Sequence, residues 1–407
     1  MSEDKRGSAF GAAGALLLAL AMLLASCAAG PEPVTDPGEA EAAPPPAGDI
    51  SYLLIPSVSF AETETAYIGK STEDLFLHYY DKDGGGSGIL CGRPDCPHNG
   101  ADCGGYVGIS QSNLLFYDGL LWWVGYDVQE KTPKNLGLYR MKPDASGRQA
   151  VFTDPLRELY ASRSVTGIRL HKGFAWIYGM DREVEDTVPY YTAFVYRVPL
   201  GETWKPELVM EKRSREYHNG FPGYWVLPVE DGVYMGLRTH KDETYGFELY
   251  RYDLETGLTE DLLIDRETGL YAYGLWIDPD GGVFITGNRD NVGAVFTLTD
   301  GKLTQTARMS AGDFSYRNPF ALNGAAVSYV SNSLTGVRRI HAVDYEGKTL
   351  YEGPWAVSPL DSGAAAFGAI TILGGDRNGF IVSVTSRDTV FARYEIKGDR
   401  LEETILW

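Results

Sequence analysis

The feature that most constrains the fold is a turn glycine that recurs along the chain, each time followed by a short apolar run. The third residue after each of these glycines is large and apolar. The glycines are Gly119, Gly173, Gly232, Gly282, Gly324 and Gly379, and the apolar column is Trp122, Trp176, Met235, Ile285, Val327 and Val382. Runs without clean alternation, such as LLWWV, are typical of strands that are covered on both faces. The chain is therefore expected to repeat one unit of packed β-structure.

A second strand with aromatic or basic residues follows each of these turns. These strands occur at Leu138, Val195, Leu249, Val295, Ile340 and Ala392, about 45 to 60 residues apart, which is the period of four-stranded propeller blades. The segment FLHYYDKDG at Phe76 supplies an equivalent strand and a seventh unit. We predict an all-β fold, a seven-bladed β-propeller of four-stranded antiparallel sheets over residues 51–407. A sandwich of two sheets is the alternative, but it does not account for the period.

The N-terminal residues predict export and a lipid anchor. Lys5 and Arg6 precede an apolar run that is short for a membrane span. The residues LASC, which end at Cys27, form a lipobox, so Cys27 would receive a diacylglyceryl thioether and become the mature N-terminus. We expect a lipoprotein signal peptide over 1–26 and a disordered Pro/Ala/acid-rich tether over 27–50. An ordinary signal peptide that is cut elsewhere is the alternative.

The net charge bears on the partners. A formal charge of −19 at pH 7 disfavours nucleic acid and anionic head groups as ligands. Contact with the membrane is expected through the lipid chains at Cys27, which place the protein on the extracytoplasmic face of the cell membrane. We expect a monomer that meets a protein or glycan partner.

Two turns resemble those of a known repeat class. The segments Tyr252–Gly257 and Ala342–Lys348 are similar to the Asp-x-x-Thr-Gly turn of quinoprotein-like repeats. With its lipobox, acidic tether, cysteine cluster and Tyr-rich repeats, the whole chain resembles the uncharacterised β-propeller lipoproteins of Gram-positive anaerobic bacteria. That resemblance implies a propeller on a lipid anchor and conveys no established activity.

The segment CGRPDCPHNGADC carries the densest chemistry in the chain. Cys91, Cys96, His98 and Cys103 offer three sulfur ligands and one imidazole, enough for a closed tetrahedral zinc site that would be structural. If Cys27 is lipidated, three cysteines remain, and an odd number fits a metal site better than a disulfide framework. A single disulfide with His98 incidental, and free or redox-reactive thiols, are the alternatives.

Other motifs favour structure over catalysis. Asp81–Gly84 begins like a calcium loop but lacks the glutamate that the twelfth position requires, so a hairpin turn is the better interpretation. The histidines share no ligand spacing, and neither a Ser-His-Asp order nor a Gly-x-Ser-x-Gly elbow appears. We therefore predict no catalytic residues.

Aromatic residues supply a hypothesis for ligand contact. Trp225 and Trp276 precede their turns, on the strand expected nearest the propeller axis, and Tyr224 and Tyr273 lie beside them. A place in the core is the favoured interpretation for both tryptophans, and contact with a ligand is the other. We expect a binding or scaffolding lipoprotein for a protein, peptide or glycan. The alternative function is a polysaccharide- or peptide-acting hydrolase or lyase that uses the channel face.

Overall fold

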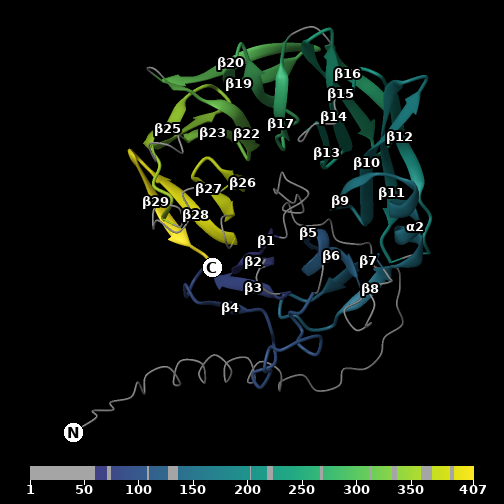
Figure 1. Ribbon diagram of the computed structural model, residues 1–407, viewed down its shortest axis with the longest axis vertical. Coiled ribbons are helices and arrows are strands. Elements are labelled where there is room, and N and C mark those ends of the chain that lie inside the picture. The colour runs from purple at the N-terminus through teal and green to yellow at the C-terminus, as the bar shows by residue number, and fades with distance from the viewer. Residues whose placement is uncertain are drawn as a thin grey trace. The chain divides into compact units, whose positions relative to one another are not determined.

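A computed structural model describes residues 60–70, 75–107, 110–126, 136–201, 203–217, 223–265, 269–311, 314–331, 337–358, 369–385 and 389–407 (Figure 1). The predicted signal peptide, Cys27 and the tether lie outside these residues. The described chain forms a seven-bladed β-propeller, as predicted. No helix among the described residues is long and apolar enough to cross a membrane.

Blades 1 to 4 each contain four strands in sequence order. Blade 1 comprises β1 (Phe60–Glu62), β2 (Ala66–Lys70), β3 (Leu77–Asp81) and β4 (Ser87–Ile89). Blade 2 comprises β5 (Ser110–Tyr117), β6 (Leu120–Tyr126), β7 (Leu136–Met141) and β8 (Gln149–Phe152). Blade 3 comprises β9 (Val165–His171), β10 (Phe174–Glu185), β11 (Val188–Pro199) and β12 (Glu207–Ser214). Blade 4 comprises β13 (Tyr224–Pro228), β14 (Gly232–Lys241), β15 (Thr244–Asp253) and β16 (Thr259–Asp265).

Blades 5 to 7 continue the same order, with one addition. Blade 5 comprises β17 (Tyr271–Ile277), β18 (Val283–Arg289), β19 (Val292–Thr299), β20 (Lys302–Ala311) and a short fifth strand, β21 (Phe314–Ser315). Blade 6 comprises β22 (Arg317–Leu322), β23 (Ala325–Ser331), β24 (Arg338–Asp344) and β25 (Thr349–Pro354). Blade 7 comprises β26 (Ala369–Asp376), β27 (Gly379–Thr385), β28 (Thr389–Lys397) and β29 (Arg400–Ile405). The helix α2 (Asp154–Ser162) joins blade 2 to blade 3.

The repeats found in the sequence coincide with particular strands of the blades. The residues of the apolar column lie on the second strand of blades 2 to 7, and all six are buried. The aromatic or basic signature marks the third strand, from β3 in blade 1 to β28 in blade 7. First strands lie nearest the axis (Figure 1). The column therefore fills the space between neighbouring blades, because the strands that carry it are covered on both faces.

The first and last blades pack against each other and close the ring. Phe60 of β1 stacks on Phe391 of β28 with ring centroids 5.5 Å apart, and on Trp407 at 5.9 Å. Leu373 and Leu406 belong to the same buried cluster. The two blades are separate sheets that pack through these side chains, so an aromatic seam joins the two ends of the described chain.

The repeating glycines serve two different purposes. Gly119 follows Asp118 in a hairpin turn where both residues have positive φ, 67° and 50°, the type I′ geometry that suits twisted strands. Gly379 is needed for packing, since a Cβ there would lie 2.2 Å from the carbonyl oxygen of Tyr394 on the paired strand. The expected hairpin at Asp81 is present, with the Asp83 N–H donating to Asp81 Oδ1 at 3.0 Å.

Candidate metal centre

The four predicted ligands lie in a loop that interrupts the outer strand of blade 1. Before the loop, the Leu90 N–H donates to the carbonyl oxygen of Leu77 at 2.8 Å. After the loop, the carbonyl oxygen of Gly105 accepts from the Leu77 N–H at 2.8 Å, so both ends of the loop bond to the same residue of β3. The neck between Leu90 and Gly105 is tight, because a Cβ at Gly105 would lie 2.0 Å from the Leu90 carbonyl oxygen. The segment 91–104 is thus an Ω-like loop with its ends together, and it lies outside the ring in Figure 1.

The loop packs against the β7–β8 turn of the next blade. A Cβ at Gly92 would lie 2.9 Å from the Asp144 carbonyl oxygen, and one at Gly104 would lie 2.5 Å from that of Ala145. From the same turn, Arg148 donates to the carbonyl oxygen of Gly104 at 2.6 Å. Only glycine permits these backbones to approach so closely. The loop therefore joins blade 1 to blade 2.

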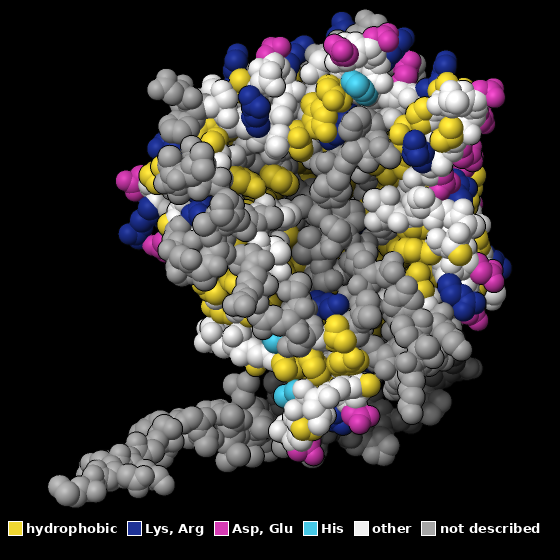
Figure 2. Space-filling model, in the orientation of Figure 1, with side chains coloured by type: hydrophobic (Ala, Val, Ile, Leu, Met, Phe, Trp, Pro, Cys, Tyr) yellow, Lys and Arg dark blue, Asp and Glu magenta, His cyan; other side chains and the backbone are white. Residues whose placement is uncertain are grey.

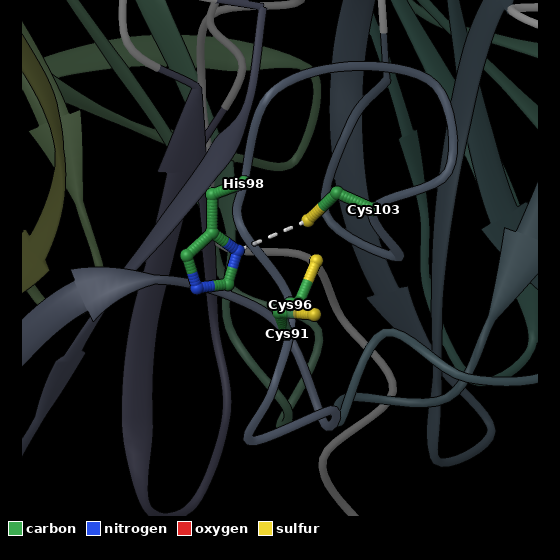
Figure 3. Close-up of side chains that lie close together, drawn as sticks. All are labelled: Cys91, Cys96, His98 and Cys103. Atoms are coloured by element: carbon green, nitrogen blue, oxygen red, sulfur yellow. Dashed lines mark hydrogen bonds between the residues drawn. The ribbon is translucent and has the colours of Figure 1, made fainter.

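The four side chains converge inside this loop, as predicted (Figure 3). Their ligand atoms all lie within 4.8 Å of one another. His98 Nδ1 lies 3.3 Å from Cys103 Sγ, and Arg93 Nη2 donates to Cys96 Sγ at 3.3 Å. His98 has a positive φ of 49°, so the turn of the backbone directs its ring inward. Cys103 is buried and the other three ligands are half-buried.

Two thiols of the cluster differ in acidity. Burial acts to raise the pKa of Cys91, but hydrogen bonds from the backbone at Arg93 and Gly104 and from the Cys103 and Cys96 thiols lower it to about 7. Burial raises the pKa of Cys103 to about 11, and its hydrogen bonds with Cys91 and Cys96 add to the increase. A thiolate at Cys91 is therefore accessible near neutral pH, and thiolates are the form that binds metal.

The donor set and its spacing suit a metal ion. In a tetrahedral zinc site with Zn–S bonds of about 2.3 Å, neighbouring sulfur atoms are roughly 3.8 Å apart. The separations in the loop fall within 4.8 Å, so small side-chain movements would complete that arrangement. All three cysteines in the described part of the chain are reduced and belong to this cluster. Four protein ligands would leave no open position for a substrate, which favours a structural role.

The predicted aromatic contact residues do not form a surface patch. Tyr224, Trp225 and Trp276 are 9%, 6% and 3% exposed, and the Tyr224 hydroxyl donates to the Phe194 carbonyl oxygen at 2.7 Å. Trp225 and Trp276 do lie on the first strands of their blades, but their rings pack between blades in the hydrophobic core. The favoured core placement therefore holds for both tryptophans, and Tyr273 is the one half-buried member of the predicted set.

Tyr273 belongs to an aromatic group that the sequence reasoning missed. The Tyr271 ring lies 5.0 Å from that of Tyr273 and 4.5 Å from that of Tyr245, and Tyr245 stacks on exposed His240 at 4.4 Å. Beneath them, the buried Arg238 guanidinium lies 3.7 Å from the Tyr271 ring centroid. These residues come from blades 4 and 5, and the sequence does not indicate which residues of different blades meet. The one available signal was the alternation of Tyr271 and Tyr273, which places both on the same face of a strand.

The comparisons with known proteins concern the fold. No protein-family model matches the chain, and no curated protein matches it. Among solved structures, it is similar to an acylaminoacyl peptidase in complex with Z-Gly-Gly-Phe-chloromethyl ketone, with a TM-score of 0.49 and 10% identity over 88% of this chain and 53% of that one. It is similar to puromycin hydrolase with a TM-score of 0.48 and 15% identity over 86% of this chain and 54% of that one. It is also similar to the β-propeller domain of the Trilobed protease from Pyrococcus furiosus, with a TM-score of 0.46 and 10% identity over 88% of this chain and 98% of that one.

The chain spans about half the length of the first two of these proteins. The likeness is to a propeller fold, and no activity follows from it for this chain.

Proposed function

We propose that this protein is an exported, lipid-anchored propeller that binds a protein, peptide or glycan partner and carries one structural zinc ion. The observation that carries the zinc site is the convergence of Cys91, Cys96, His98 and Cys103 in a loop whose neck is closed and whose two ends pack on blade 2. A bound zinc would cross-link the loop and so hold the contact between the two blades.

Elemental analysis tests the zinc site. Protein purified without reductant should carry about one zinc ion per chain, because the four ligands complete a tetrahedral shell. Cys96→Ala should lose the metal and lower the melting temperature, whereas Asp102→Asn, an exposed change in the same loop, should retain it. A metal-free protein with a mass about two units below the reduced value would establish a disulfide instead.

The lipid anchor rests on the sequence alone. Leu24–Cys27 and the apolar run before it support export and lipidation of Cys27, and the acidic tether would hold the propeller away from the membrane. Cys27→Ser should abolish labelling by a fatty-acid analogue and release the protein or leave its precursor unprocessed. Labelling that persists in this variant would contradict the anchor.

Two surfaces support a binding role. The half-buried tyrosines around Tyr271 offer aromatic faces, and a polar cleft of about 590 Å³ lies against blade 3. Acidic and basic side chains are interspersed around the outer rim of the face in Figure 2, with hydrophobic side chains between them. A reproducible hydrolase or lyase activity, abolished by a single carboxylate substitution, would replace the binding role with the enzymatic alternative.

A further inference from the structure

The hairpin of β10 and β11 extends beyond the rest of its blade. Both strands have 12 residues, whereas β9, the neighbour of β10, has 7. The pairing of β10 with β9 ends at Gly179 and Val165, and the remainder of β10, up to Glu185, pairs on one side only. Among the described strands, none covers the other edge of β10 over residues 181–185. This edge is an unusual exposure in a closed propeller.

The register identifies which backbone groups lie on the open edge. Asp186 and Thr187 both have positive φ, so they form a type I′ turn and the flanking pair Glu185 and Val188 is hydrogen-bonded. Hydrogen-bonded and non-hydrogen-bonded pairs then alternate, and the N–H and C=O groups of Val184 and Arg182 point away from β11. The same alternation places the Met180 N–H outward, where it donates to the Ser164 carbonyl oxygen at 3.1 Å.

The side chains beside this edge carry more negative than positive charge. Asp181, Glu183 and Glu185 alternate along β10 and therefore share one face. Arg213 contacts both Glu183 and Glu185, and Arg163 contacts both Asp181 and Glu211. Each of these two arginines thus lies between two carboxylates. Arg215 lies over the Tyr190 ring on the same face, so four carboxylates there face three arginines, an excess of one negative charge.

A cleft lies along the open edge. Its volume is about 590 Å³. Ser162 and Ser164 line it beside the edge, β10 contributes three carboxylates, and the cleft continues over the face of β11 and β12, where it is lined by Thr192, Glu211 and Arg213. Arg182, on the opposite face of β10, also lines it, so its walls carry four carboxylates and three arginines. A cleft that reaches the unpaired edge of β10 provides space for an added strand, about 4.8 Å from its neighbour.

We propose that the β10 edge binds an extended basic peptide of a partner protein, which adds to blade 3 as a further strand with Lys or Arg at alternate positions. The proposal rests on the binding role proposed above and specifies its ligand class. The N–H and C=O groups of Arg182 and Val184 bond the peptide backbone, as in strand addition to other sheet edges. Basic side chains at i and i+2 are about 6.8 Å apart, which matches the spacing of the β10 carboxylates. Charges on an edge strand exclude apolar strands, and here they select a basic one.

Fluorescence anisotropy with two labelled hexapeptides of equal composition tests the proposal. Val-Lys-Thr-Lys-Val-Lys places its lysines on one face of a strand, whereas Lys-Lys-Lys-Val-Val-Thr does not. The first peptide should bind the full chain at least tenfold more tightly than the second, and its affinity should fall as salt increases. Equal binding of the two peptides, or binding of neither, would overturn the proposal.

Variants at the edge locate the contact. Val184→Pro removes an outward N–H without breaking a bond to β11, because proline is tolerated on the open side of an edge strand. It should weaken binding of the first peptide at least tenfold, while Val184→Thr should stay within about twofold of the original chain. Hydrogen exchange should show that the peptide protects the amides of Arg182 and Val184.

These outcomes separate the peptide site from the wider proposal. If the Val184→Pro chain binds the first peptide as tightly as the Val184→Thr chain does, the peptide binds elsewhere. That result would overturn the edge site even if the original chain binds the peptide. Labelling of Cys27 and the zinc content of the chain do not depend on this edge, so they test the lipoprotein and metal proposals separately.

Discussion

The cysteine loop of blade 1 and the β10–β11 hairpin of blade 3 both depart from the regular propeller, and they are held by different means. The hairpin is a continuous antiparallel ladder that ends in a type I′ turn, so local rules suffice to form it. The loop 91–104 has few backbone hydrogen bonds of its own and depends on its neck, its contact with blade 2 and the Cys/His cluster. A regular ladder can leave its edge available to a partner, whereas an irregular loop needs a cross-link.

The largest expected difference between the two regions comes from the neck of the loop. Gly105→Ala places a Cβ against the Leu90 backbone, at 2.0 Å in the present geometry, and backbone cannot move aside as a flexible side chain can. We expect a loss of about 3 kcal/mol in the free energy of unfolding, from overpacking at the neck of the loop within blade 1. Urea unfolding measures this loss, and hydrogen exchange should show faster exchange in the loop with the β10–β11 amides unchanged.

Gly86→Ala is the matched control, since a Cβ there meets nothing within 4 Å. This control should be close to the original chain in stability. A Gly105→Ala protein as stable as Gly86→Ala would show that the neck does not constrain the loop.

The second prediction concerns the acidity of the loop thiols. In metal-free, reduced protein, iodoacetamide should label Cys91 with an apparent pKa of about 7, because its lowered pKa gives a thiolate near neutral pH. Its rate should rise about tenfold from pH 6 to pH 8, as the thiolate fraction does. Cys103, with a pKa of about 11, should stay unreactive over that range. Peptide mapping by mass spectrometry measures both rates, and preferential labelling of Cys103 would contradict the assignment.

The two regions also differ in how far the sequence predicted them. The cysteine cluster was predictable because all four ligands fall within one short segment, whose length limits how far apart they can lie. The propeller was predictable because its blades form from consecutive residues, so the repeat of Trp122 and its equivalents survives in the sequence. The cleft of blade 3 was not, since its walls come from α2, β10, β11 and β12, and no residue spacing along the chain marks where these side chains meet.

The failure at Trp225 and Trp276 has a related cause. Their placement on first strands followed from the order of the turns, but an inner strand can direct a side chain to the channel or to the next blade. That choice depends on strand parity and on bulges such as the one between Ala272 and Gly274. A single sequence does not specify where such a bulge lies, so the pattern favoured the core for both tryptophans but did not exclude the channel.

The smallest expected effect on stability comes from an ion pair on the β10–β11 hairpin. Arg213→Ala removes the contacts with Glu183 and Glu185, but the arginine side chain is 42% exposed, and surface ion pairs contribute little. We expect the melting temperature to fall by about 1 °C, less than for any change at the neck of the loop. Arg163→Ala should cost more, because this arginine is 20% exposed and lies 4.2 Å from the Phe194 ring centroid. Calorimetry at low and high salt checks the order: a fall for Arg213→Ala that exceeds that of Arg163→Ala would mean that the hairpin, like the loop, depends on a specific cross-link.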